Sequence, residues 1–204
     1  MTNANNASGD PTPDDLDELD LPPLPAVVFT LLKQENASPR LIAHLTLVHA
    51  VALLLVRRLK RAWPTLAFDA EAVAFGAASH DVGKARFPQE LSEPGVKHEV
   101  AGRALLLEHG TPERLARFAE THGQRSAEPV SIEDLLVIAA DTVWKGKRSK
   151  ELDDQLVKAI VDLTRAPPWD VFMRLDGILG ALAGAADDRL SWQARFSCEA
   201  RQVR

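Results

Sequence analysis

The chain has 204 residues, of which 46% are hydrophobic and 26% are charged. This balance is typical of a folded globular protein and excludes collagen-like, coiled-coil and wholly disordered chains. A domain of this length buries enough apolar surface to fold without a disulfide or a structural metal, so a metal site in it would serve chemistry. The single cysteine, Cys198, precludes an intramolecular disulfide and favours a cytoplasmic protein.

The net charge of -5 is unevenly distributed along the chain. Six of the 29 acidic residues lie within residues 1–20, which contain no Lys or Arg, so the remaining 23 face 24 basic residues. Because the rest of the chain is nearly neutral, it offers no broad basic field for nucleic acid. The longest unbroken apolar run, Ala50–Val56, is far shorter than the roughly 20 residues of a membrane helix. We therefore expect neither nucleic acid nor a membrane as a partner.

Residues 1–25 are rich in Asn, Asp, Pro and Ser and are predicted to form a disordered acidic tail. Apolar residues then recur at helical spacing, Tyr is absent and β-branched runs are short, so residues 26–204 are predicted to form a single all-α domain. Its motifs lie within residues 38–148, and C-terminal helices occupy residues 150–204. The expected helices are, in chain order, Ala26–Gln34, Pro39–Ala62, Ala70–His80, Lys97–Glu108, Pro112–His122, Ser131–Trp144, Lys150–Thr164 and Trp169–Ala200.

Capping and turn residues set these boundaries. Ser38 is a typical N-cap before a proline, and Ser131 with Asp134 resembles a capping box. A loop is expected between Pro88 and Gly95, and an interruption of the last helix near Gly184 is left open. The last helix is expected to bury a stripe formed by Trp169, Phe172, Leu175, Leu179 and Leu182.

Histidine and aspartate side chains stand on helix faces that are otherwise apolar. Asp141, for example, follows six apolar residues, and a carboxylate buried there needs either a metal ion or an Arg or Lys partner. Taken singly, each histidine is more often an ordinary core residue. Taken together, four inward-facing histidines and two aspartates suit a divalent transition metal. The set comprises His44, His80, Asp81, His98, His122 and Asp141, whereas His49 and His109 are expected to lie outside it.

The order of these residues resembles the H…HD…H…H…D signature of the HD-domain superfamily of helical metal-dependent phosphohydrolases. The segment His80-Asp81-Val82-Gly83-Lys84 resembles its HDxGK variant, and His98 with Gly102 resembles an HxxxG element. The arrangement also resembles the HD-type diadenosine tetraphosphate hydrolases. It departs from the cyclic-di-GMP phosphodiesterases, because Gly123 and Gln124 follow His122 in place of the HHE and GYP elements. The Glu that follows the HD pair in related nucleotidases and guanosine-tetraphosphate hydrolases is also missing.

The resemblance implies an HD-domain helical bundle with a C-terminal helical extension. It implies hydrolysis of a phosphate ester or anhydride of a small phosphorylated metabolite, most simply a nucleotide, by a metal-activated hydroxide. One or two divalent ions are implied, of Fe, Mn, Ni, Co, Zn or Mg. One ion would be held by His44, His80, Asp81 and Asp141, and the other by Asp81, His98 and His122. Asp81 and Lys84 are the candidate catalytic residues, and Lys84, Lys145 and Arg148 are candidates to contact substrate phosphate.

Two other functions stay open on the sequence. The same ligand order serves HD-related di-iron oxygenases that act on inositol or aminophosphonates. A regulatory HD module could also bind a nucleotide without turnover, as a homodimer built on the C-terminal helices. The basic residues after Asp141 could equally be solvated at the end of their helix.

Overall fold

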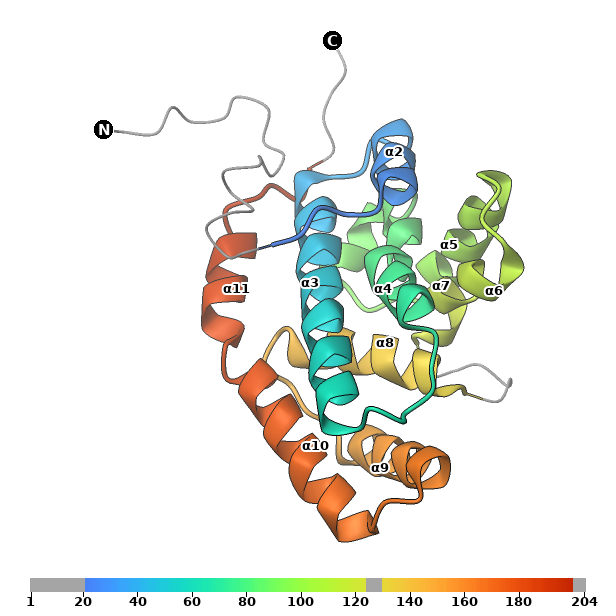
Figure 1. The fold of residues 1–204 in the computed structure, drawn as a ribbon. Coiled ribbons are helices and arrows are strands. Elements are labelled where there is room, and N and C mark those ends of the chain that lie inside the picture. The colour runs from blue at the N-terminus through green and yellow to red at the C-terminus, as the bar shows by residue number, and fades with distance from the viewer. Residues whose placement is uncertain (1–20, 124–129, 200–204) are drawn as a thin grey trace.

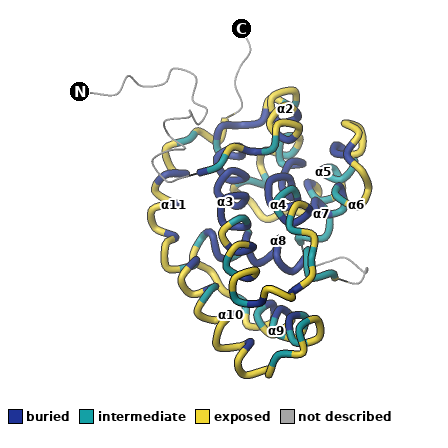
Figure 2. Tube along the Cα trace, in the orientation of Figure 1, coloured by how far each residue is buried: buried dark blue, intermediate teal, exposed yellow. Residues whose placement is uncertain are grey.

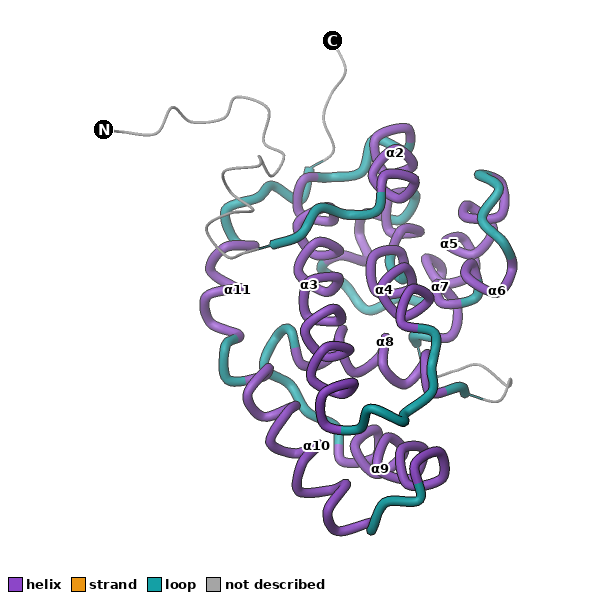
Figure 3. The backbone as a smooth tube through the Cα atoms, in the orientation of Figure 1, coloured by secondary structure: helices purple, strands orange, loops and turns teal. Residues whose placement is uncertain are grey.

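The computed structural model describes residues 21–123 and 130–199, and helices are the only regular elements within these two ranges (Figures 1 and 3). The all-α prediction is therefore confirmed. Residues 1–20 of the predicted acidic tail lie outside the described residues. The prediction that the tail extends to residue 25 is wrong, because Leu21 and Leu24 are buried against the helices that follow.

The helices follow the predicted order. The first three are α2 (Ala26–Gln34), α3 (Pro39–Ala62) and α4 (Ala70–Ser79). Two 3₁₀ turns, η1 (Val82–Ala85) and η2 (Pro88–Leu91), lead to α5 (Lys97–Glu108), α6 (Glu113–Ala116) and α7 (Phe118–Thr121). The rest comprises α8 (Ile132–Val143), α9 (Lys150–Thr164), α10 (Pro168–Ala183) and α11 (Ala186–Gln193).

Side-chain caps explain where the central helices begin. The Ser38 hydroxyl accepts a hydrogen bond from the first turn of α3, and the Asp69 carboxylate accepts one from the first turn of α4. Ser131 and Asp134 form the predicted capping box at the start of α8. Each cap satisfies a backbone N–H that has no partner within its helix.

The predicted helix Pro112–His122 is wrong as a continuous element, because it is divided into α6 and α7. The side chain of Arg117, at the junction, turns back so that its Nε donates to the carbonyl of Arg114 over 3.2 Å. A continuous helix would offer that carbonyl to the N–H of Phe118. The arginine thus competes with the backbone at this point.

The predicted last helix is also divided, with α10 and α11 separated at Gly184 and Ala185. The buried stripe of α10 consists of Val171, Leu175, Leu179 and Leu182. The inclusion of Trp169 and Phe172 in this stripe is wrong: Trp169 is 68% exposed, and the two rings stack on each other 5.5 Å apart at the surface. By the helical period, Phe172 lies beside the buried face, whereas Trp169 lies well away from it.

The central helix α3 is surrounded by the others and is buried along most of its length (Figures 1 and 2). Its N-terminal part packs with α2, η1 and α5 in one apolar cluster, and its C-terminal part packs with α8, α9, α10 and α11 in a second. By length and composition α3 could cross a membrane, but 83% of its most apolar window is buried in the protein. Burial of this extent is characteristic of a core helix.

Candidate metal centre

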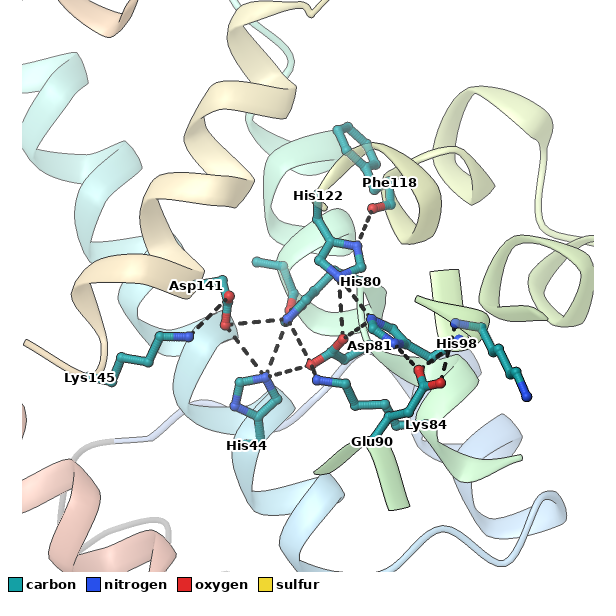
Figure 4. Close-up of polar contacts among 12 residues, drawn as sticks. His44, His80, Asp81, Lys84, Glu90, His98, Phe118, His122, Asp141 and Lys145 are labelled. Carbon is teal, nitrogen blue, oxygen red and sulfur yellow. Dashed lines mark hydrogen bonds and ion pairs between the residues drawn. The ribbon is translucent and has the colours of Figure 1, made fainter. Parts of the chain in front are cut away.

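Six polar side chains from five parts of the chain converge in the interior beside α3 (Figure 4). His44 lies on α3, and His80 and Asp81 lie between α4 and η1. His98 lies in the first turn of α5, His122 directly follows α7, and Asp141 lies in the last turn of α8. The structure thus brings together every residue of the predicted ligand set.

The Asp81 carboxylate lies between two pairs of histidines. Its Oδ2 lies 3.1 Å from His44 Nε2 and 3.4 Å from His80 Nε2. Its Oδ1 lies 3.1 Å from His98 Nε2 and 3.4 Å from His122 Nε2. Asp81 is buried, and Oδ1 is the one buried side-chain oxygen or nitrogen in the described ranges without a well-oriented hydrogen-bond donor. An anionic oxygen in that state calls for a cation.

Asp141 completes the first of two clusters. Its Oδ1 lies 3.6 Å from His44 Nε2 and 3.5 Å from His80 Nε2, and it accepts a hydrogen bond from Trp144 Nε1 over 3.2 Å. Each cluster offers three ligand atoms that all lie within 4.8 Å of one another. His44, His80 and Asp141 make up the first cluster, and Asp81, His98 and His122 make up the second.

The histidine rings are held with their Nε2 atoms towards the centre. In three of them Nδ1 lies beside an oxygen that only accepts: Ala77 O for His80 (3.0 Å), Glu90 Oε2 for His98 (2.6 Å) and Phe118 O for His122 (3.3 Å). The proton of a neutral ring therefore sits on Nδ1, and the Nε2 lone pair faces inward. His98 Nε2 and His122 Nε2 are only 3.3 Å apart. Two facing lone pairs need a cation between or beside them, so the donor set fits divalent metal.

The pKa values of the buried groups depend on one another. Burial lowers the pKa of His44. Burial acts in the same direction on His80, but the negative charge of Asp81 and the hydrogen bond with Asp141 outweigh it and raise the pKa of His80 to about 9. Burial in turn favours the neutral form of Asp81, yet the charge of His80 and the surrounding hydrogen bonds hold the Asp81 pKa well below its usual value. The centre therefore keeps both carboxylates ionised, and in the absence of metal a protonated His80 supplies compensating positive charge.

Two glycines allow the motif segments to approach each other closely. A Cβ at Gly83 would lie 2.6 Å from the Gly102 nitrogen and nearer still to the carbonyl oxygen of His98. A Cβ at Gly102 would in turn lie 3.0 Å from that of Ala119. The missing side chains let η1 pack directly on the backbone of α5, which sets the separation of Asp81 and His98.

The predicted phosphate-contacting residues divide into two groups. Lys84 Nζ donates to Asp81 Oδ2 over 2.6 Å, and Lys145 Nζ donates to Asp141 Oδ2 over 3.4 Å, so both ammonium groups flank the centre. The two side chains are partly exposed. The helix α4 ends at Ser79, so Lys84 lies on the following 3₁₀ turn η1 and not on a continuation of α4.

Arg148 is not brought to the centre in the same way. Its guanidinium lies 2.8 Å from Asp153 Oδ2 on α9 and 3.1 Å from Asp176 Oδ1 on α10. It joins these two helices and contacts neither of the central aspartates in the structure. A role for Arg148 in contacting substrate phosphate gains no support from this geometry.

His49 and His109 lie outside the clusters, as expected. His49 Nδ1 contacts the carbonyl of Ala74 over 3.0 Å, and His109 Nδ1 contacts that of Leu105 over 2.9 Å. Each histidine is thus satisfied by a backbone oxygen on a neighbouring turn or helix.

Sequence reasoning missed the roles of Glu90 and Trp144. Glu90 contacts His98, and Trp144 donates a hydrogen bond to Asp141, so both residues orient members of the ligand set. Glu90 lies on η2 and also accepts hydrogen bonds from the N–H groups of Lys97 and His98 at the start of α5. A signal for it existed, because the N-cap residue Val96 has no side-chain oxygen to satisfy that turn. The indole of Trp144 also packs edge-on against His44, with ring centroids 5.0 Å apart.

Comparisons with known proteins agree with this geometry. An uncharacterized protein of Methanocaldococcus jannaschii is 31% identical over 105 aligned residues, which cover 44% of this chain and 59% of the relative. The chain thus spans less than two thirds of that relative's length. No solved structure matches the chain. The family model described as HD domain matches residues 41–144, half of the chain, and this range contains all six converging residues. The chain therefore belongs to the HD domain family.

Proposed function

We propose that the chain is a metal-dependent phosphohydrolase that cleaves a phosphate ester or anhydride of a small phosphorylated metabolite, with nucleotides as the substrate class. The observation that carries this proposal is the buried Asp81 carboxylate, whose two oxygens face two separate histidine pairs. His44, His80 and Asp141 would hold one divalent ion with Asp81, and His98 and His122 would hold the other. The unsatisfied Asp81 Oδ1 supports this assignment.

Divalent ions bound there would lower the pKa of a water molecule and neutralise charge that develops on phosphoryl oxygens. The chain itself supplies positioning and charge. The Lys84 and Lys145 ammonium groups flank the carboxylates and could pair with phosphate oxygens of the substrate. Trp144 holds Asp141 Oδ1 through its indole N–H, which fixes the orientation of that carboxylate.

Nucleotides are proposed because the motif order resembles that of HD-type diadenosine tetraphosphate hydrolases. Dinucleoside polyphosphates are therefore the first substrates to test. We also propose a cytoplasmic setting, since the exposed Cys198 is the chain's sole cysteine and no internal disulfide can form. A homodimer through the C-terminal helices stays a prediction.

The test is hydrolysis of a panel of phosphomonoesters, phosphodiesters and nucleotide anhydrides by protein loaded with Mn²⁺, Co²⁺, Ni²⁺ or Fe²⁺. We expect turnover of at least one nucleotide, reduced at least 1000-fold in Asp81→Asn, a magnitude on the order of that for removing a principal catalytic group. His109→Ala, which removes a histidine outside the clusters, is the matched control and should stay within twofold of the wild type. Absence of cleavage across the panel, or equal rates in Asp81→Asn and wild type, would contradict the proposal.

The same preparations distinguish the other functions of this ligand order. Two irons per chain and oxygen uptake with a polyol or phosphonate would indicate an oxygenase. Tight nucleotide binding by calorimetry without hydrolysis over hours would indicate a regulatory module. Either result would replace the phosphohydrolase proposal.

A further inference from the structure

Glu90 contacts His98 from the side facing away from the centre (Figure 4). Its side chain is 6% exposed, and its Oε2 lies 2.6 Å from His98 Nδ1. The same oxygen accepts the backbone N–H of His98 over 3.1 Å, and Oε1 accepts that of Lys97 over 3.3 Å. The carboxylate is therefore anchored to the backbone that carries the ring it orients.

The surrounding loop encloses this carboxylate. A Cβ at Gly95 would lie 2.5 Å from Glu90 Cγ and closer to the carboxyl group itself. Only a residue without a side chain lets the loop pass so close to Glu90. The loop thereby keeps water from the Glu90–His98 contact, which strengthens a charge-assisted hydrogen bond.

The contact distinguishes His98 from two other histidines of the centre. The Nδ1 atoms of His80 and His122 face neutral backbone carbonyls, whereas His98 Nδ1 faces a carboxylate. A carboxylate partner fixes the ring and its tautomer and makes Nε2 a stronger donor towards a metal. The charge of Glu90 thus acts directly on only one of the two clusters.

We propose that Glu90 is a positioning residue that sets the affinity of the Asp81–His98–His122 cluster for a divalent cation, through the orientation and basicity of His98. This inference rests on the proposed function, because it requires that the cluster bind metal. It further implies that the two metal positions can be tuned independently, since Glu90 touches neither His44 nor Asp141 in the structure.

The experiment is a calorimetric titration of metal-free protein with Co²⁺, with bound metal counted by elemental analysis. Glu90→Gln keeps the volume and an acceptor oxygen but removes the charge, and Glu93→Gln removes the same charge from an exposed position three residues along. We expect two Co²⁺ per wild-type chain. In Glu90→Gln one dissociation constant should rise about 10- to 100-fold while the other stays within threefold. Glu93→Gln should match the wild type.

A double variant tests whether Glu90 acts on the second cluster alone. In His122→Ala, where the second cluster lacks a ligand, adding Glu90→Gln should change the remaining Co²⁺ affinity less than threefold. Nitrogen-15 spectra of metal-free protein, recorded where His98 is neutral, add a readout independent of metal. His98 should carry its proton on Nδ1 in the wild type and should become a mixture of tautomers in Glu90→Ala.

The outcomes separate this inference from the proposed function. If the wild type binds two Co²⁺ and Glu90→Gln leaves both constants unchanged, or weakens both equally, the inference fails and the metal centre stands. An unchanged His98 tautomer in a folded Glu90→Ala variant would also overturn it. If the wild type binds no Co²⁺, the proposed function fails and the inference fails with it.

Discussion

Replacing Gly83 with alanine should damage both the fold and the second cluster. The new Cβ would lie 2.6 Å from the Gly102 nitrogen and 2.9 Å from the His98 carbonyl carbon, and both neighbours are backbone atoms that cannot rotate away. Relief requires η1 and α5 to separate by several tenths of an ångström or more. His98 Nε2 and Asp81 Oδ1 are 3.1 Å apart, and this separation of η1 and α5 would move them away from each other.

The expected cost follows from overpacking, which destabilises by about 1–3 kcal/mol and occasionally more. Because the contact is with backbone, we expect about 3 kcal/mol, or a fall in melting temperature of roughly 6–12 °C for a protein of this size. Gly177→Ala is the matched control: no atom lies within 4 Å of its Cβ in α10. It should gain about 0.5–1 kcal/mol, because alanine suits a helix better than glycine.

Differential scanning calorimetry of metal-free protein measures the stability change, and Co²⁺ titration of the folded variant at low temperature measures the effect on the cluster. We expect Gly83→Ala to weaken the binding of at least one ion tenfold or more. A Gly83→Ala variant that melts and binds Co²⁺ as the wild type does would refute the close-approach argument. A loss of stability in Gly177→Ala of the same size would show that the cost is unrelated to this contact.

Three further predictions concern metal, substrate and acid. Co²⁺ at about 100 times its dissociation constant should stabilise the protein by about 2.7 kcal/mol per site and raise its melting temperature by several degrees, which scanning calorimetry with and without chelator checks. Lys84→Ala should lower kcat/KM for a nucleotide substrate by roughly tenfold or more, as expected for loss of a charged phosphate contact, whereas steady-state assays of Arg148→Ala should show less than a twofold change. Burial favours protonation of Asp134, but the hydrogen bonds from Arg117 and its neighbours outweigh burial and lower the pKa of this carboxyl. Its contribution to stability is therefore complete above pH 4–5 and is lost as the pH falls through the lowered value. Urea unfolding of metal-free Asp134→Asn should show a loss of about 2 kcal/mol at pH 7 and a shallower decline on acidification than the wild type shows; identical acid profiles would contradict this assignment.

The centre could be predicted from sequence because its groups conflict with their local surroundings. Asp141 follows an apolar run, and His44 lies on a buried face of α3, so each needs a partner that the nearby sequence does not supply. Residues that share this need and are far apart in the sequence can therefore be predicted to meet at one site in the fold. Capped helices such as α8 could be predicted for the related reason that a cap is a local feature.

The missed features depend on residues that are distant in sequence or on competing side chains. Glu90 stands in a stretch that resembles an ordinary turn, and its role appears only when η2 packs beside the start of α5. Arg148 was placed beside the centre by sequence proximity to Asp141, but the acidic groups of α9 and α10 compete for it. The division between α6 and α7 likewise depends on where the Arg117 side chain turns.

In the proposed centre one carboxylate, Asp81, joins two divalent metal positions. An anomalous difference map from crystals grown with Co²⁺, recorded at the cobalt absorption edge, tests it most directly. We expect two peaks, one beside His44, His80 and Asp141 and one beside His98 and His122, with one oxygen of Asp81 directed at each. A map from a metal-replete crystal without a peak at these residues, or with the histidines joined only to ordinary hydrogen-bond partners, would contradict it.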